Sequence, residues 1–130
     1  QVCTALLQSN PNIKAIFCTE GITGPGAYAA VRTVGREGQV TIVASDFGSA
    51  VLELLKEGKI QGTVVDDPYM MGYQTMLEIY AAAHPTDILS VNAPFGHVPT
   101  SNILFGSSLL TTESINDPNV AAKYENPPQF

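Results

Sequence analysis

The stretch "VTIVASDFGSAVLELLKEGKIQGTVVDD" (residues 40–67) indicates the fold class, because it contains one pattern twice. An apolar run, 39–45, ends at Asp46, and apolar residues at helical spacing follow. A second apolar run, 60–65, then ends at Asp66. An apolar strand, an amphipathic helix and another apolar strand in succession predict parallel strands covered by helices.

The pattern extends in both directions along the chain. Upstream, "IKAIF" (13–17) is predicted to be a strand that ends near Glu20. Downstream, Asp67 and Pro68 are predicted to be the N-cap and the first residue of a helix that continues over 69–83. We therefore predict an α/β fold, a three-layer sandwich around a mainly parallel sheet, forming one Rossmann-like lobe.

The alternation stops after Pro85. Residues 87–102 are predicted to be a loop and 102–110 a further strand. We assign 1–107 to the α/β lobe and 108–130, which is polar and rich in proline, to a C-terminal tail.

The composition describes one globular domain without nucleic-acid chemistry. The 130 residues, 45% of them hydrophobic and 14% charged, suffice for a single core. A net charge of -6 argues against a nucleic-acid partner, because a phosphate backbone would be repelled. No apolar run approaches the roughly 18 residues of a membrane-spanning helix. His84 and His97 lack metal-ligand spacing and a nucleophile, so we predict no metal, no cofactor and no enzyme.

Cys3 and Cys18 are too few for a disulfide scaffold and too far apart for a CxxC motif. Both are expected near the C-terminal end of the first strand. A disulfide and two buried free thiols are both compatible with that position.

Three acidic residues mark the expected ligand site, and each follows a predicted strand: Glu20, Asp46 and Asp66. Open parallel sheets bind ligands beyond the carboxyl ends of their strands. Carboxylates accept hydrogen bonds from the neighbouring hydroxyls of a polyol, and they also suit a cationic ligand. Phe47 lies next to Asp46 and is a candidate to stack on a sugar face.

Structural roles would also account for these residues. Asp46 precedes "FGS" and could close an Asx turn, while Phe47 could belong to the core. Phosphate binding is disfavoured, because "GITGPG" (21–26) has the spacing GxxGxG rather than GxGxxG and the chain has no GK[ST]. Glu20 beside those amides would also repel an anion.

The order and spacing of these motifs resemble the C-terminal lobe of ribose-type periplasmic sugar-binding proteins, the solute receptors of ABC importers. The resemblance rests on "LLQSNPNIKAIF" (6–17), "VASD" (43–46) and "LLKEGKIQGTVVDDPYMMGY" (54–73), with "NILFGSSLLTTESI" (102–115) similar to the closing segment of the family. It implies a type I periplasmic-binding-protein fold of two lobes, with the sugar in the cleft between them. It also implies a membrane permease as partner and a periplasmic or extracellular location, secreted or lipid-anchored.

The resemblance assigns roles residue by residue. Asp46 matches the family's aspartate that binds sugar hydroxyls, whereas Asp66 stands where ribose receptors carry glutamine and Glu20 where they often carry asparagine. A carboxylate donates no hydrogen bond, so the expected ligand offers more donors than ribose: another polyol, or an amine-bearing compound.

The segments that resemble the family account for only one of its two lobes, and so for one wall of the cleft. We therefore expect a fragment or isolated lobe that lacks the N-terminal lobe. Such a piece would expose apolar surface and could self-associate. Its tail, 108–130, would return toward the missing lobe.

The alternative is the effector-binding lobe of a lactose-repressor-type regulator, which shares the fold. A helix-turn-helix in the parent gene would support that alternative, and a signal peptide would refute it. A phospho-acceptor receiver domain also gathers acids at a sheet edge. It needs a lysine at a late strand end, however, and "NILFGSS" (102–108) has none.

Overall fold

The computed structural model describes residues 1–84, 86 and 106–125. The chain divides into two compact units, Gln1–Val65 with Ser108–Phe130, and Asp66–Ser107. Each unit is described separately below. Within the described residues, no helix is both long enough and apolar enough to span a membrane.

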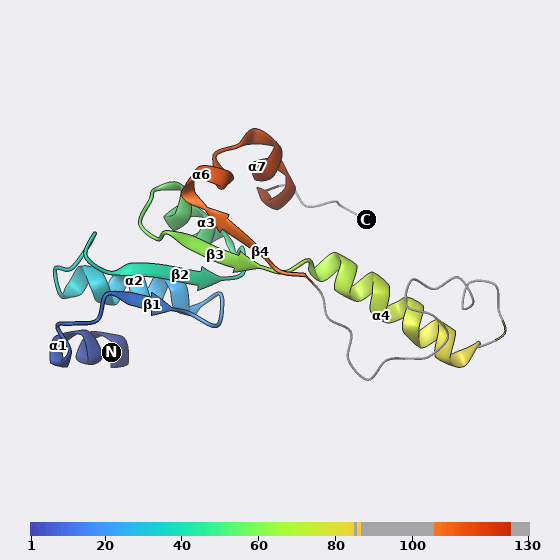
Figure 1. Ribbon diagram of the computed structural model, residues 1–130, viewed down its shortest axis with the longest axis horizontal. Coiled ribbons are helices and arrows are strands. Elements are labelled where there is room, and N and C mark those ends of the chain that lie inside the picture. Colours follow the sequence, from blue (N-terminus) through green and yellow to red (C-terminus); the bar gives the residue numbers. More distant parts are fainter. Residues whose placement is uncertain (85, 87–105, 126–130) are drawn as a thin grey trace. The chain divides into compact units, whose positions relative to one another are not determined.

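A four-stranded sheet forms the centre of the first unit (Figure 1). Its strands lie in the order β1 (Ala15–Phe17), β2 (Thr41–Ser45), β3 (Gly62–Val65) and β4 (Ser108–Thr111). The first three are parallel and β4 is antiparallel to β3. The α/β fold with a mainly parallel sheet is therefore confirmed, and the carboxyl ends of β1, β2 and β3 share one edge.

Helices connect the strands and cover one face of the sheet (Figure 1). α2 (Thr23–Thr33) packs against β2, and α3 (Ser49–Lys56) packs against β3. α1 (Val2–Ser9) lies beside α2. Parallel neighbours require such crossovers, because a tight turn cannot join two parallel strands.

The covered face of the sheet forms the core. The strand residues that point into it are at most 4% exposed: Ile42, Ala44, Thr63, Val65 and Leu110. The aliphatic members of this set pack with Val31 of α2 and with Val51 and Leu55 of α3. Because side chains alternate along a strand, this burial also fixes which residues point to the other face.

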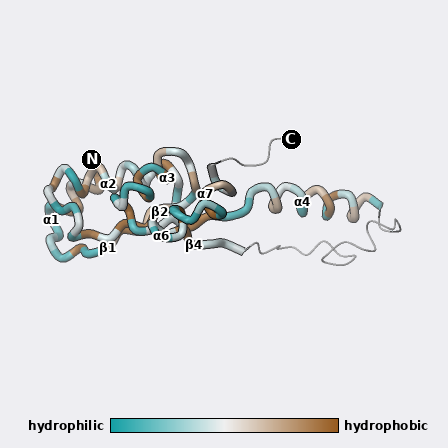
Figure 2. Tube along the Cα trace, turned by 90° about the horizontal axis from the view of Figure 1, so that it is seen from above, coloured by the Kyte–Doolittle hydropathy of each residue, from teal (hydrophilic) through white to brown (hydrophobic). Residues whose placement is uncertain are grey.

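The other face of the sheet carries exposed apolar side chains. Phe17 is 61% exposed and Leu109 is 59% exposed. The register pairs Phe17 with Val43 and Leu109 with Val64, so both exposed side chains project from the same side. Figure 2 shows the hydrophobic colouring along β1.

Residues 108–130, expected to form a tail, contribute β4, α6 (Thr112–Ile115) and α7 (Pro118–Glu125) to the first unit. The expected boundary after residue 107 thus falls directly before a strand of the sheet. Thr111 and Ser114 form a capping box that starts α6, with Thr111 N–H donating to Ser114 Oγ at 2.8 Å. The strand predicted over 102–110 is found at Ser108–Thr111, and the loop predicted over 87–102 lies outside the described residues.

The second unit contains α4 (Pro68–Ala83). Asp67 Oδ1 accepts a hydrogen bond from the Met70 N–H at 3.0 Å, and Pro68 occupies the first helical position. The predicted N-cap and helix start are therefore confirmed. Hydrophilic and hydrophobic residues alternate along α4 in Figure 2.

A candidate ligand site at the carboxyl ends of β1 and β2

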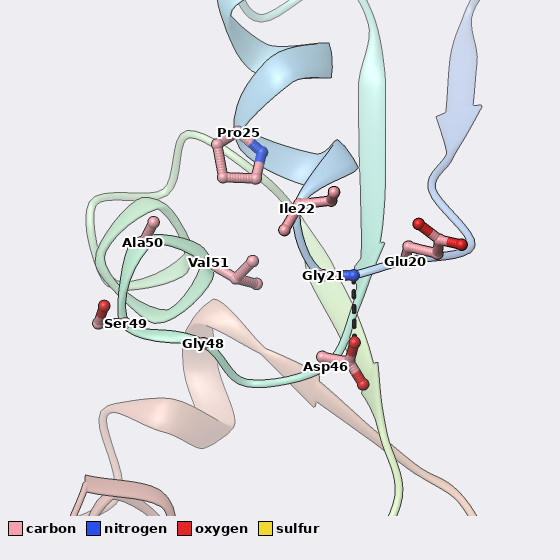
Figure 3. Close-up of a pocket in the computed structure, with 9 residues that line it drawn as sticks. All are labelled: Glu20, Gly21, Ile22, Pro25, Asp46, Gly48, Ser49, Ala50 and Val51. Atoms are coloured by element: carbon pink, nitrogen blue, oxygen red, sulfur yellow. Dashed lines mark hydrogen bonds between the residues drawn. The ribbon is translucent and has the colours of Figure 1, made fainter.

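A cavity of about 670 Å³ opens at the carboxyl edge of the sheet (Figure 3). Two turns line it, the one between β1 and α2 and the one between β2 and α3. The lining residues are Glu20, Gly21, Ile22, Pro25, Asp46, Gly48, Ser49, Ala50 and Val51. The position agrees with the general rule for ligand sites in open parallel sheets.

The turn after β1 carries Glu20. The Cys18 N–H donates to Val43 O at 2.9 Å, so pairing with β2 continues one residue beyond β1. Thr23 closes the turn, because its N–H and its hydroxyl both donate to Glu20 O, at 3.1 and 2.6 Å. The backbone of Glu20 is thereby held, while its side chain remains exposed at the cavity.

The turn after β2 carries Asp46 in a left-handed backbone conformation, with φ of 65°. Aspartate tolerates this region better than most residues, although it still costs energy there. Two backbone bonds hold it: Asp46 N–H donates to Val64 O at 2.8 Å, and the Thr63 hydroxyl donates to Asp46 O at 2.6 Å. The unusual conformation is therefore fixed by β3.

The Asp46 carboxylate points across to the first turn (Figure 3). Its Oδ2 accepts a hydrogen bond from the Gly21 N–H at 3.1 Å. The Ser45 hydroxyl makes a second link between the turns by donating to Cys18 O at 2.7 Å. The two strand ends are thus joined by two direct hydrogen bonds.

The structure brings together two of the four predicted site residues, Glu20 and Asp46. Phe47 does not line this cavity. Its ring packs edge-on against Tyr124 of α7, with centroids 5.6 Å apart, and it is half-buried against the core. Asp66 belongs to the second unit and is exposed.

Three residues that position the site were not predicted: Gly21, Ser45 and Thr63. Thr63 is fully buried in an otherwise apolar strand. Because buried polar groups are nearly always hydrogen-bonded, a threonine in such a run indicates a specific hydrogen bond at that position. Gly21 directly follows Glu20, but its role depends on Asp46, which is distant in sequence. No local pattern distinguishes it from the neighbouring glycines.

The charge and polarity of the lining favour hydrogen-bond donors as ligands. Glu20 and Asp46 supply carboxylates, Ser49 supplies a hydroxyl, and no lysine or arginine lines the cavity. Within the described part of the chain, no cluster of three or more His, Cys, Asp or Glu could hold a metal ion. Ile22, Pro25 and Val51 add apolar surface.

Cys18 lies behind the turn that carries Glu20 and is 5% exposed. Burial raises the pKa of the Cys18 thiol; a hydrogen bond with Thr23 opposes this effect and the nearby Cys3 adds to it. Both cysteines are free thiols in the structure. Cys18 is therefore a core residue and does not supply a nucleophile to the cavity.

Residues 1–84 match the model of the periplasmic binding protein domain family, so the chain belongs to this family. The resemblance inferred from the sequence is confirmed.

Two curated relatives have names that describe sugar binding. The chain is 35% identical over 71 residues to the D-allose-binding periplasmic protein of Escherichia coli (strain K12), covering 55% of this chain and 23% of that relative. It is 33% identical over 87 residues to the D-ribose/D-allose-binding protein of Pseudomonas aeruginosa, covering 65% and 27%. The chain thus spans about a quarter of the length of these relatives.

Solved structures of similar fold include sugar complexes. An ABC transporter solute-binding protein from Agrobacterium vitis, bound with α-D-tagatopyranose, superimposes with a TM-score of 0.72 at 26% identity, covering 92% of this chain and 37% of that one. A carbohydrate transporter solute-binding protein from Agrobacterium radiobacter, in complex with D-arabinose, gives a TM-score of 0.66 at 28% identity and covers 95% and 38%. These proteins and the two relatives are binding proteins rather than enzymes by their names.

Proposed function

We propose that this chain forms one wall of the sugar-binding cleft of a solute receptor for an ABC importer. The observation that carries the proposal is the joining of Glu20 and Asp46 in one cavity at the carboxyl edge of the sheet. Membership of the periplasmic binding protein domain family supports it, as do the sugar-binding names of the relatives. The corresponding location is the periplasm or the cell exterior, secreted or lipid-anchored.

The cavity offers the two kinds of contact that a sugar needs. The carboxylates of Glu20 and Asp46 accept hydrogen bonds from hydroxyl groups, and these charge-assisted bonds are stronger than neutral ones. Ile22 and Val51 offer apolar surface to the C–H groups of a sugar ring. In this proposal a second lobe supplies the other wall, and closure around the ligand creates the surface that a membrane permease recognises.

The acidic lining narrows the ligand class. Neither Glu20 nor Asp46 can donate a hydrogen bond when ionised. A ligand rich in donors, either a polyol other than ribose or an amine-bearing sugar, therefore fits this wall. The regulator alternative has no support among the relatives and structures described above, whose names describe binding and transport.

A thermal-shift assay on the full-length protein encoded by the gene tests the proposal. The panel contains D-allose, D-ribose, D-tagatose, D-arabinose and D-glucosamine, with L-leucine as a non-sugar control. At 100 times its Kd, a bound sugar adds about 2.7 kcal/mol of stability, which raises Tm by several degrees. Asp46→Ala should make the shift smaller, whereas Glu57→Ala, which changes an exposed acid at the C-terminal end of α3, should retain it. Shifts with leucine but with no sugar would contradict the proposal.

A further inference from the structure

Gly21 faces the Asp46 carboxylate across the cavity floor (Figure 3). We infer that Gly21 is a positioning residue for ligand binding, which sets the orientation of that carboxylate through its N–H and through its lack of a side chain. The inference rests on the proposed function, and it assigns a role to a residue that need not touch the ligand itself.

A side chain at residue 21 would crowd the side chain of Asp46. A Cβ atom built there would lie 2.9 Å from Asp46 Oδ2 and 3.0 Å from Asp46 Cβ. Carbon atoms in van der Waals contact are about 3.5–4.0 Å apart, so an alanine would have to displace its neighbour. The need for glycine at this position comes from the contact with Asp46, since Gly21 has no positive φ.

The backbone of Asp46 cannot yield easily to such a displacement. Its N–H is bonded to Val64 O and its carbonyl to the Thr63 hydroxyl, and its φ of 65° is already unfavourable. The backbone of Asp46 is thus held by β3, so a methyl group at residue 21 would push mainly on the carboxylate or on the turn that carries Glu20.

The contact also leaves the other carboxylate oxygen available to a ligand. Oδ2 holds the Gly21 N–H, and within the described residues Oδ1 has no protein donor. Asp46 therefore presents Oδ1 as its free acceptor in a fixed direction. Fixing a binding group before the ligand arrives lowers the cost of ordering it on binding.

Gly26 is a matched control for Gly21. It lies in α2 and is exposed, and a Cβ atom built there meets no atom within 4 Å. Gly26→Ala therefore makes the same chemical change a short distance away without touching Asp46.

The experiment measures D-allose affinity by calorimetry in the full-length protein, with four variants: Gly21→Ala, Gly26→Ala, Asp46→Ala and the double variant Gly21→Ala/Asp46→Ala. Gly21→Ala should weaken binding about 10- to 100-fold, the range for disturbing one hydrogen bond to a charged group. Gly26→Ala should stay within about twofold of the wild type. In the Asp46→Ala background, Gly21→Ala should not weaken D-allose binding further, because Gly21 affects binding only by orienting the Asp46 carboxylate.

The outcomes separate this inference from the proposed function. If the wild type binds D-allose and Asp46→Ala weakens binding while Gly21→Ala behaves like Gly26→Ala, the role of Gly21 is overturned and the proposed function stands. An equal loss from Gly21→Ala in both backgrounds would also overturn it, since a merely structural effect would not depend on Asp46.

A second measurement covers two further cases, failure of Gly21→Ala to fold and failure of the wild type to bind D-allose. Amide hydrogen exchange of Gly21 is compared between the wild type and Asp46→Ala. Removing the acceptor should make exchange at least about tenfold faster, because the N–H loses its hydrogen bond. An unchanged rate would overturn the positioning contact regardless of which ligand the protein binds.

Discussion

At the residue scale, neighbouring acids of the same type take different roles. Asp67 caps α4 through its bond to the Met70 N–H, and Pro68 follows it in the first helical position. Asp66, one residue earlier, is exposed and remains a proposed ligand contact. The difference comes from position relative to the helix start, since only the residue at the N-cap can reach the free amides of the first turn.

Asp67→Ala should lower the stability of α4 by about 1 kcal/mol, because an orphan amide of the first turn loses its acceptor. Asp67→Asn should retain most of that stability, since asparagine caps helices nearly as well. Urea denaturation followed by far-ultraviolet circular dichroism measures the change. Asp66→Ala is the matched control, and an equal loss in both alanine variants would show that capping is not the cause.

Cys18 should react slowly with thiol reagents. Its side chain is buried and its pKa is raised, so less of the reactive thiolate is present near neutral pH, and the fraction grows only at higher pH. Alkylation by iodoacetamide, followed by mass spectrometry between about pH 7 and pH 9, should modify the half-buried Cys3 at least about tenfold faster. The variants Cys3→Ser and Cys18→Ser separate the two signals, and equal rates would contradict the burial of Cys18.

At the element scale, Arg36 connects segments on either side of α2. Its guanidinium Nη2 donates to Pro11 O at 2.9 Å and also to Ile13 O. These carbonyls lie in the connection between α1 and β1, so the side chain fixes the path by which the chain enters the edge strand. The planar guanidinium holds its N–H donors in a rigid arrangement, so it loses less conformational freedom per hydrogen bond than the flexible ammonium of lysine.

Arg36→Ala should destabilise the chain by about 2 kcal/mol, because the carbonyl groups of Pro11 and Ile13 lose a charged hydrogen-bond donor. Arg36→Lys should recover only part of this loss. Arg32→Ala, an exposed change on α2, should fall within about 0.5 kcal/mol of the wild type. Chemical denaturation measures all three, and a neutral Arg36→Ala would show that these bonds contribute nothing.

The elements themselves were predictable because burial leaves a pattern in the sequence. The run expected at 39–45 is found as β2 at Thr41–Ser45, since both faces of a parallel strand are apolar. The residue type alone does not determine where a helix begins. Ser49 has a side chain suited to an N-cap, yet α3 begins at that residue and its N-cap is Gly48, with no side-chain bond. Helix ends depend on local geometry that one residue type does not determine.

The candidate site was predictable only in part, for a similar reason. Glu20 and Asp46 follow apolar strands, and parallel topology brings such positions to one edge. The packing of Phe47 was not predictable, because its partner, Tyr124, lies in a helix that the sequence did not indicate. Contacts between distant residues, such as that between Gly21 and Asp46, require the folded structure.

At the scale of the whole molecule, the sheet of the first unit carries exposed apolar side chains on one face. Phe17 and Leu109 project from it, and each is more than half exposed. Exposed apolar side chains on one face of a sheet favour association between copies of the chain, because contact between the copies removes apolar area from water. We therefore expect the 130-residue chain on its own to self-associate.

Sedimentation velocity over a range of concentrations tests this expectation. The wild-type chain should sediment faster as concentration rises, and Phe17→Ser should weaken the dependence. Ala15→Ser, on the same strand and face but with little apolar area to lose, is the matched control. A chain that remains monomeric at every concentration would contradict the expectation.

The central claim is that the edge carrying Glu20 and Asp46 is one wall of a sugar site. The most direct measurement is a crystal structure of the full-length protein with a bound sugar from the panel above. We predict a sugar hydroxyl or amine within about 3.2 Å of Asp46 Oδ1, with the Gly21 N–H still bonded to Oδ2. A sugar bound elsewhere, with neither Asp46 nor Glu20 in contact with it, would contradict the account.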